Sequence, residues 1–356
     1  MPYSAWDEYF IHQLPRTLDQ VSDSEKSWSD RCYFNAHSPD GMVLLVTGYG
    51  NNPNTQSAHG YAKLSLADGR HWDLDAVRKC TTDRGDLYAG PMRWTCVEPL
   101  ERWKLELGPN ASGIEWELHY ESRAPMWELL PIIIRKQGRV LADMHHIKQP
   151  ARYSGWIKVD GEEISVDGFF GGRDRTFGVR VSEQIDFWLW FEAVFEDRAI
   201  EAWVWESSDG AVQYVDGGIT FNDGRLSKRF VKFEHDIEFN GDRKRPARAD
   251  IVFVDDDGDK VNVTAHAANQ DVGVYYGLGH SRRQVSGGGL SFYTWKGTEP
   301  ADLEEVESRA VSMDQLMHYE MEGMAGLGIF ELLVQGDGYS RYPTWRPTTR
   351  DAKRRR

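Results

Sequence analysis

The chain has 356 residues, of which 40% are hydrophobic and 28% charged, and its formal net charge at pH 7 is −14. This length can hold two domains, or one large domain, with a substantial core. A chain this acidic repels phosphate, so we expect no nucleic-acid partner.

Targeting and redox signals are weak. The first ten residues, MPYSAWDEYF, lack the basic and apolar regions of a signal peptide. No apolar run approaches the roughly 18 residues that cross a bilayer. The cysteines, Cys32, Cys80 and Cys96, form no C-x-x-C pair that would indicate zinc or redox chemistry. We therefore expect a cytoplasmic protein with no membrane span, and the sequence makes no prediction of its oligomeric state.

The first half of the chain reads as a series of β-hairpins. Strand-like segments at 32–38 and 42–50 are separated by Pro-Asp-Gly, and those at 60–66 and 71–77 by Ala-Asp-Gly-Arg. Further on, residues 114–123 alternate strictly, with Ile114, Trp116, Leu118 and Tyr120 on one face. This period of two predicts a strand with one buried face.

The second half continues in the same style. A hairpin is predicted to turn at Asp160-Gly161, and short aromatic strands follow from 187 to 297, while a helical patch is expected only within 300–324. Roughly sixteen or more short strands indicate an antiparallel all-β protein, built as two barrels or sandwiches side by side. Pro150 and its basic neighbours place the expected boundary between domains 1–150 and 151–356.

Two motifs that suggest metals fail on their spacing. The segment VDDDGDK at 254–260 lacks the ligand positions and the final Glu of a calcium loop, and it predicts a hairpin turn. His145 and His146 are adjacent, and neighbours on a strand point to opposite faces, so they cannot share one ion. We expect no metal site, and no nucleotide-binding pattern indicates a cofactor.

Paired tryptophans mark two of the later strands. Trp188 and Trp190, and then Trp203 and Trp205, lie two residues apart, so each pair shares one face of a strand. Such pairs fit the packed core of a barrel. They also fit the wall of a ligand cavity, where an aromatic face can stabilise a cation.

The segment VDGFFGGRDRTFGVR, residues 166–180, is the most unusual in the chain. It places Asp174 between Arg173 and Arg175, after three glycines. One interpretation is an ion pair on a surface turn, with the arginines favouring the ionised carboxylate. The other is that strand alternation buries Asp174 and turns both arginines away, while the glycines allow a bulge that returns Phe177 to the side of Asp174.

Residues 153–180 resemble the central signature of the AttH-like, double-lipocalin proteins, a superfamily that includes carotenoid 1,2-hydratase (hydroxyneurosporene synthase). The closest likeness is to its uncharacterised bacterial members, and 87–107 and 326–343 resemble the same group. The resemblance implies two consecutive calycin, or lipocalin-like, β-domains with an apolar cavity between or inside them. It also implies catalysis by an Asp-x-x-Trp pair. Asp174 matches the Asp, whereas Phe177 stands in place of the Trp.

Two functions follow from these observations. The first is a cofactor-free hydratase, dehydratase, cyclase or isomerase that acts on an apolar isoprenoid, polyketide or aromatic molecule. In it, Asp174 is the general acid, Phe177 its catalytic partner, and Trp188, Trp190, Tyr214 and Tyr276 bind the substrate. The second is a non-catalytic carrier of an apolar metabolite. A buried Asp174 with a high pKa favours the enzyme, and an exposed Asp174 paired with an arginine favours the carrier.

Overall fold

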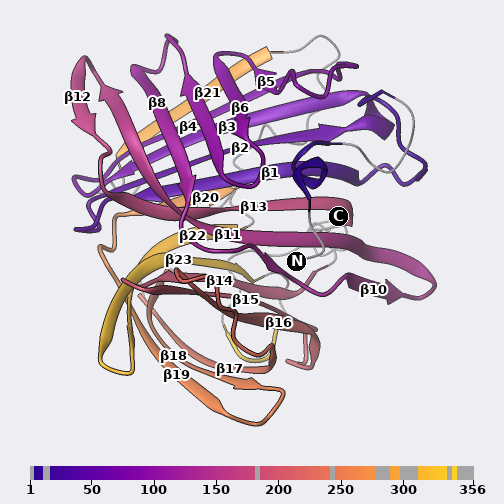
Figure 1. Ribbon diagram of the computed structural model, residues 1–356, viewed down its shortest axis with the longest axis vertical. Coiled ribbons are helices and arrows are strands. Elements are labelled where there is room, and N and C mark those ends of the chain that lie inside the picture. The colour runs from indigo at the N-terminus through magenta and orange to yellow at the C-terminus, as the bar shows by residue number, and fades with distance from the viewer. Residues whose placement is uncertain are drawn as a thin grey trace, which may run out of the picture.

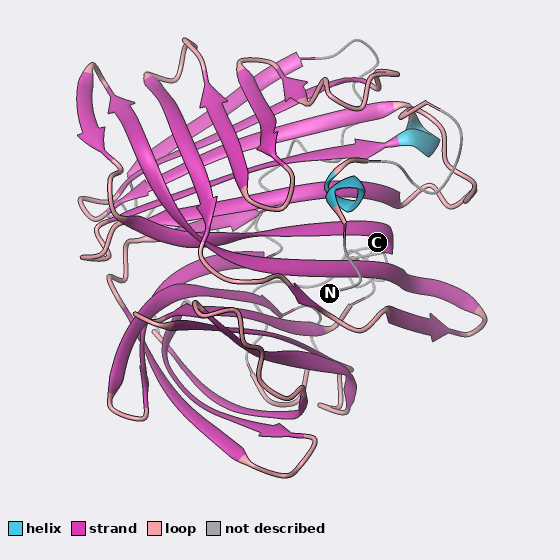
Figure 2. Cartoon of the chain, in the orientation of Figure 1, coloured by secondary structure: helices cyan, strands magenta, loops and turns pink. Residues whose placement is uncertain are grey.

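A computed structural model describes residues 4–10, 17–180, 185–240, 245–276, 289–296, 312–334 and 339–342, with the backbone alone for 290–296. The described chain is built from strands, together with the short 3₁₀ helices η1 (Ala5–Glu8) and η2 (Pro53–Thr55). Figure 1 and Figure 2 show the strands gathered into an upper and a lower barrel-like sheet. The fold is all-β, as the sequence predicted.

The upper sheet contains fourteen described strands in the order β21-β4-β3-β2-β1-β13-β11-β8-β7-β6-β5, with β9, β10 and β12 added beside β11. Its members are β1 (Trp28–His37), β2 (Val43–Asn52), β3 (Ser57–Leu66), β4 (Arg70–Lys79), β5 (Tyr88–Ala89), β6 (Met92–Glu98), β7 (Arg102–Leu107), β8 (Ile114–Ser122), β9 (Trp127–Glu128), β10 (Ile132–Lys136), β11 (Arg139–Val159), β12 (Glu162–Ser165), β13 (Phe169–Arg180) and β21 (Gly289–Lys296).

The lower sheet contains nine described strands in the order β16-β15-β14-β23-β22-β19-β18-β17, with β20 added beside β22. Its members are β14 (Phe187–Val194), β15 (Arg198–Glu206), β16 (Val212–Phe221), β17 (Phe230–Phe239), β18 (Pro246–Asp255), β19 (Lys260–Ala267), β20 (Gly273–Tyr276), β22 (Ser312–Met321) and β23 (Met324–Val334). All pairs in both sheets are antiparallel, and each sheet forms a nearly closed barrel.

Local sequence signals explain many of these elements. In β8 the predicted alternation holds, because Ile114, Trp116, Leu118 and Tyr120 are buried while the residues between them are partly or fully exposed. The predicted turn at Asp160-Gly161 joins β11 to β12, and both residues adopt the positive φ that this tight hairpin requires. The VDDDGDK segment joins β18 to β19 as the predicted hairpin.

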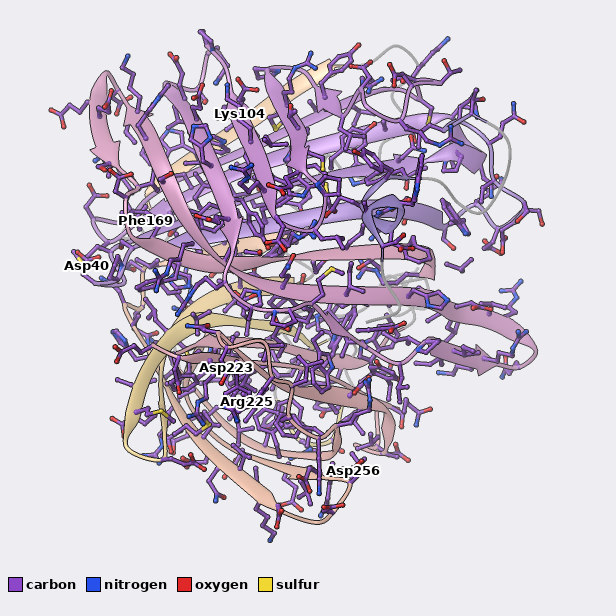
Figure 3. All side chains as sticks on the ribbon, viewed as in Figure 1. Asp40, Lys104, Phe169, Asp223, Arg225 and Asp256 are labelled. Atoms are coloured by element: carbon purple, nitrogen blue, oxygen red, sulfur yellow. The ribbon has the colours of Figure 1, made fainter. Side chains whose placement is uncertain are left out.

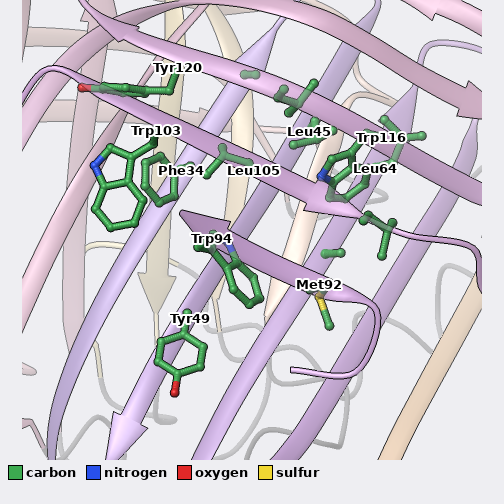
Figure 4. Packing of buried hydrophobic residues seen from close by; sticks show 14 of the residues in the cluster. Phe34, Leu45, Tyr49, Leu64, Met92, Trp94, Trp103, Leu105, Trp116 and Tyr120 are labelled. Carbon is green, nitrogen blue, oxygen red and sulfur yellow. The ribbon is translucent and has the colours of Figure 1, made fainter. Parts of the chain in front are cut away.

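Both barrels have packed apolar interiors. The upper interior is filled by large aromatic side chains, including Trp94, Trp103 and Trp116 (Figure 4). The lower interior is filled by Phe191, Phe253 and neighbours of similar size. Charged side chains of the turns, such as Asp40 and Asp256, are exposed at the periphery (Figure 3). The aromatic strands therefore serve mainly as core, in the way that high aromatic content predicts for β-structure.

Strand β11 runs through the position where the sequence predicted a domain boundary. Residue 150 lies inside β11, which is a continuous strand of the upper sheet, and Pro150 pairs with Gly172 of β13. The chain changes sheet between β13 and β14, after Arg180, so the 166–180 segment belongs to the upper barrel. β21 then returns from the second half of the chain to pair with β4.

Part of the segment 300–324, in which the sequence predicted a helical patch, forms a strand instead. Residues 297–311 lie outside the described residues, but Ser312–Met321 forms strand β22. This strand is buried on both faces, since Met313 and Met317 enter the lower interior while Leu316 packs between the sheets. A strand buried on both faces loses the alternating pattern that identifies strands in a sequence.

No helix among the described residues has the length and apolar character needed to cross a membrane.

Candidate functional site

A third cluster of buried residues lies between the two sheets, outside both barrel interiors. It joins Tyr33 of β1 and Met144 of β11 to Trp190 of β14 and Trp203 of β15. Figure 1 shows β13 and β11 beside the strands of the lower sheet. Because these strands are covered on both sides, alternate residues along each point into a barrel or into this inter-sheet region.

The GGRDR segment is divided by that alternation. Arg173 points into the upper barrel, where its guanidinium donates to both carboxylate oxygens of Glu8 at 2.5 and 2.8 Å. Arg175 also points there and pairs with Asp30 at 3.0 Å. Asp174 points the other way, towards the lower sheet. The arginines are thus neutralised by partners other than Asp174.

Asp174 lies in a small polar network. Its carboxylate accepts from the Thr176 hydroxyl at 3.5 Å and lies 3.7 Å from Nε2 of His146. The Nδ1 atom of His146 is 2.5 Å from the Thr176 hydroxyl, and Trp190 donates its indole N–H to Nε2 of His146 at 3.2 Å. These contacts assemble Asp174 from β13, His146 from β11 and Trp190 from β14 on one inter-sheet surface.

The environment of Asp174 favours its neutral form. The side chain is 15% exposed, and burial raises the pKa of Asp174 to about 7. The positive charges of Arg180, Lys148 and Arg31 act in the opposite direction. Since an ordinary aspartate has a pKa near 4, burial is the dominant cause. A carboxyl poised near neutrality can both give and take a proton.

Two further carboxyls, Glu192 of β14 and Glu201 of β15, face the same region. They pair directly across their strands, and both are fully buried. Burial raises the pKa of Glu192 to about 7 and that of Glu201 to about 8. Lys148 lies nearby with its Nζ 3.6 Å from the centre of the Trp190 ring, and burial lowers its pKa to about 8.

Asp314 of β22 also faces this region. Its Oδ2 atom accepts from the hydroxyls of Tyr33 at 2.8 Å and Tyr276 at 2.5 Å. Burial raises the pKa of Asp314 to about 6, and the two hydrogen bonds act against that rise. Glu331 of β23 accepts from the indole of Trp188 at 3.1 Å, and burial raises its pKa as well.

Phe177 is not brought to the side of Asp174. The pairings of β13 with β1 and β11 run without a register shift, so the expected bulge is absent. Regular alternation therefore leaves Phe177 on the arginine face, where its ring stacks on His145 with centroids 5.1 Å apart. The side chain at this position cannot contact what Asp174 contacts.

The other predicted residues do reach the inter-sheet region. Trp188 and Trp190 belong to its buried cluster, and Tyr214 and Tyr276 pack against it. Trp190 contacts the Asp174 network through the hydrogen bond from its indole to His146. Tyr214 lies near Trp205, and its hydroxyl donates to the Leu130 carbonyl at 2.9 Å. Whether any of them binds a substrate stays a prediction.

Sequence reasoning missed His146, Lys148, Glu192 and Asp314 as members of this site. The sequence did contain a signal for Glu192, because this residue interrupts the apolar run FWLWFEAVF. Burying a charged side chain there costs free energy unless the charge is paired, hydrogen-bonded or neutralised. The alternation that separated His145 from His146 was correct. The same alternation places His146 on the face of β11 that lies beside Thr176 and Asp174 of β13.

Other features of the described chain do not compete with this site. No group of three or more His, Cys, Asp or Glu residues in the described ranges could hold a metal ion. A hollow of about 260 Å³ lies elsewhere, by Leu100, Arg123, Met126 and Gln149. Gln149 accepts from Arg173, so this hollow lies on the arginine side of β13.

Solved structures with the same architecture include an AttH protein (NE1406) of Nitrosomonas europaea. Its TM-score is 0.61 at 14% identity, covering 88% of this chain and 93% of that one. Kievitone hydratase of Nectria haematococca gives 0.58 at 11% identity, covering 94% and 95%. CghA, solved with Sch210972, gives 0.56 at 13% identity, covering 87% and 89%. At these identities the likeness establishes the double-barrel fold.

No curated protein matches the sequence. A family defined by sequence does match, and it covers residues 3–341, which is nearly the whole chain. That span includes both barrels and every residue of the inter-sheet site. The chain therefore belongs to the family of unknown function DUF8625.

Proposed function

We propose that the protein is a cofactor-free enzyme in which Asp174 protonates a carbon of a small, largely apolar molecule. The observation that carries this proposal is the placement of Asp174. Its carboxyl is largely buried between two sheets, turned away from both neighbouring arginines, with a pKa raised to about 7. A surface ion pair would have lowered that pKa instead.

Protonation of an alkene produces a carbocation, which needs an electron-rich neighbour. Trp190 supplies an indole at the site, and its ring lies 5.7 Å from that of Tyr33. Both belong to the face of Asp174, so they replace Phe177 in our proposal as the aromatic partner. Capture of the cation by water, loss of a proton or attack by another double bond would give hydration, isomerisation or cyclisation.

We infer the substrate class from the side chains around Asp174. Tryptophan and tyrosine rings suit an apolar isoprenoid, polyketide or aromatic body, while the buried carboxyls suit one or two polar groups on it. The fold shared with kievitone hydratase and the AttH protein is consistent with this chemistry. We place the family in the AttH-like and carotenoid 1,2-hydratase superfamily on this basis, and we expect it to act in the cytoplasm.

The test is to incubate the purified protein in D₂O with a panel of prenylated phenols, terpenoid alkenes and their alcohols. Mass spectrometry then detects the gain or loss of water, or deuterium taken up by carbon. We expect at least one compound to be converted by the wild type. Asp174→Asn should reduce that conversion by about 10²–10⁴-fold, the usual contribution of a general acid.

Asp256→Asn is the matched control, because it makes the same change on an exposed turn (Figure 3). It should leave conversion unchanged. Conversion that survives Asp174→Asn would refute the role of Asp174. Binding of panel compounds without conversion by any variant would support the carrier function instead.

A further inference from the structure

Gly172 leaves room for the carboxyl of Glu192 in the inter-sheet site. It lies on β13 two residues before Asp174 and on the same face. A Cβ atom added at Gly172 would collide with Oε2 of Glu192, which reaches across from the lower sheet. The absence of a side chain at 172 therefore makes the space that the Glu192 carboxyl occupies.

The carboxyl of Glu192 is hydrogen-bonded at one oxygen and lacks a described hydrogen-bond partner at the other. Oε1 accepts a hydrogen bond from Nδ2 of Asn35 at 3.1 Å. Oε2 has no hydrogen-bond partner among the described residues, although the side chain is fully buried. A buried oxygen in this condition is costly unless something donates to it. It thus points to a donor that arrives with a ligand, or to a water.

Glu192 and Asp174 present their carboxyls to the same face of β13. Adjacent rows on one face of a strand are about 7 Å apart, which is the offset between Gly172 and Asp174. The two carboxyls are close enough for the charge of Asp174 to act on Glu192. One group can therefore give a proton while the other takes one.

We propose that Glu192 is the general base that works with Asp174 and that it activates a water molecule, so that the substrate exchanges water across a carbon–carbon double bond. This inference rests on the proposed function and deepens it. Asn35 is a positioning residue, because its amide fixes the carboxyl of Glu192. Gly172 admits that carboxyl to the site.

The reaction balances without a further reactant. In hydration, the π electrons of the double bond take the proton of Asp174 and form a C–H bond. The oxygen of a water molecule then bonds to the cationic carbon while Glu192 removes one proton from that water. Asp174 ends as a carboxylate and Glu192 as an acid, and solvent exchange restores both. Dehydration runs through the same steps in reverse.

Several charged groups set the protonation of the pair. The groups that face Glu192 are Lys148 on β11, Asp174 on β13 and Asp314 on β22. Glu201 on β15, which pairs with Glu192 across the two strands, faces it as well. The charged and titratable groups that act on Asp174, or on which it acts, are Arg180 on β13, Lys148 and His146 on β11, Arg31 on β1, Tyr61 on β3, Glu192 on β14, Glu201 on β15, Asp314 on β22 and Glu331 on β23. Because the negative charge of Asp174 raises the pKa of Glu192, the two protons are coupled.

The first test needs no substrate. Protein labelled with ¹³C at the glutamate carboxyls is titrated by NMR, and the Glu192 signal is assigned as the one missing from Glu192→Gln. In Asp174→Asn we expect the midpoint of that signal to move to lower pH. Glu163→Gln, an exposed glutamate on β12, is the control that should leave it in place. A Glu192 midpoint that does not respond to Asp174→Asn overturns the pair, whether or not any compound is converted.

The second test uses the compound that the panel identifies. The wild type should show a bell-shaped dependence of kcat/KM on pH. Glu192→Gln should lower the rate by about 10²–10⁴-fold and remove the acidic limb, whereas Asp174→Asn should remove the basic limb. Gly172→Ala should lower the rate by displacing Glu192, and Gly108→Ala, where an added Cβ makes an ordinary contact, should not.

A Glu192→Gln enzyme with full activity and an intact acidic limb would overturn the inference while leaving the role of Asp174 standing. Loss of activity with both limbs retained would also overturn it, because a purely structural role would produce that result.

Discussion

Replacing Glu8 by alanine should lower the free energy of unfolding, because it leaves the buried guanidinium of Arg173 without its carboxylate partner. Arg173 and Glu8 are 2% and 1% exposed. The substitution removes the acceptor of two guanidinium hydrogen bonds, and of the backbone N–H of Leu100 at 2.6 Å. Breaking a buried ion pair from one side costs about 3–5 kcal/mol, because the remaining charge stays buried without a partner. That is a large part of the roughly 5–15 kcal/mol that stabilises a typical protein.

The assay is urea unfolding followed by tryptophan fluorescence, since Trp103 lies 5.9 Å from the Arg173 guanidinium. We expect the midpoint to fall while the denaturant slope is unchanged. Adding Arg173→Met to Glu8→Ala should restore most of the loss, because no buried charge then remains. Asp223→Asn, which breaks an exposed pair with Arg225 (Figure 3), is the control and should have no measurable effect. A loss below about 1 kcal/mol in Glu8→Ala would refute the reasoning.

Two further predictions concern the buried titratable groups. Asp174, Glu192 and Glu201 have raised pKa values, so the folded protein binds protons that the unfolded chain has already lost above about pH 4. The contribution of these three groups to the free energy of unfolding should therefore fall as pH rises from about 4 to 8, while histidines such as His37 and His59, whose pKa values burial lowers to about 3, act in the opposite direction. Thermal unfolding should show that the stability of the wild type declines more with pH than that of Asp174→Asn; an equal slope in both proteins would contradict this. Burial raises the pKa of the Cys32 thiol to about 12, so Cys32 should not react with a disulfide reagent until the protein unfolds. Peptide mass mapping locates the modified cysteines, and modification of Cys32 in the native protein would contradict its burial.

Local features of the fold were predictable because neighbours in sequence set them. The alternation of β8 and the turn at Asp160-Gly161 follow from residue type and spacing alone. The separation of Asp174 from Arg173 and Arg175 follows from the period of a strand. Each of these needs only a few consecutive residues.

The rest depends on contacts between distant segments. Asp174 meets Glu192 from another sheet, and Tyr33 meets Asp314 across 281 residues. Alternation gives two faces to a strand, but it does not say which neighbouring sheet covers each. The expected bulge at Phe177 relied on glycines that instead accommodate close neighbours. Gly171 has φ +146° and packs against the backbone of Asn35, and Gly172 receives Glu192.

The return of β21 to β4 has a consequence for how the protein is made. The upper barrel contains residues up to Arg180, yet among the described strands the one that pairs with the outer side of β4 is β21, residues 289–296. During synthesis, β4 therefore remains an open edge until most of the lower barrel has left the ribosome. An uncovered edge strand can pair with another chain. Completion of the upper barrel therefore requires a strand that is synthesised after most of the lower barrel. A ribosome that stalls between residues 180 and 289 would release a chain with β4 uncovered, and we expect that chain to aggregate.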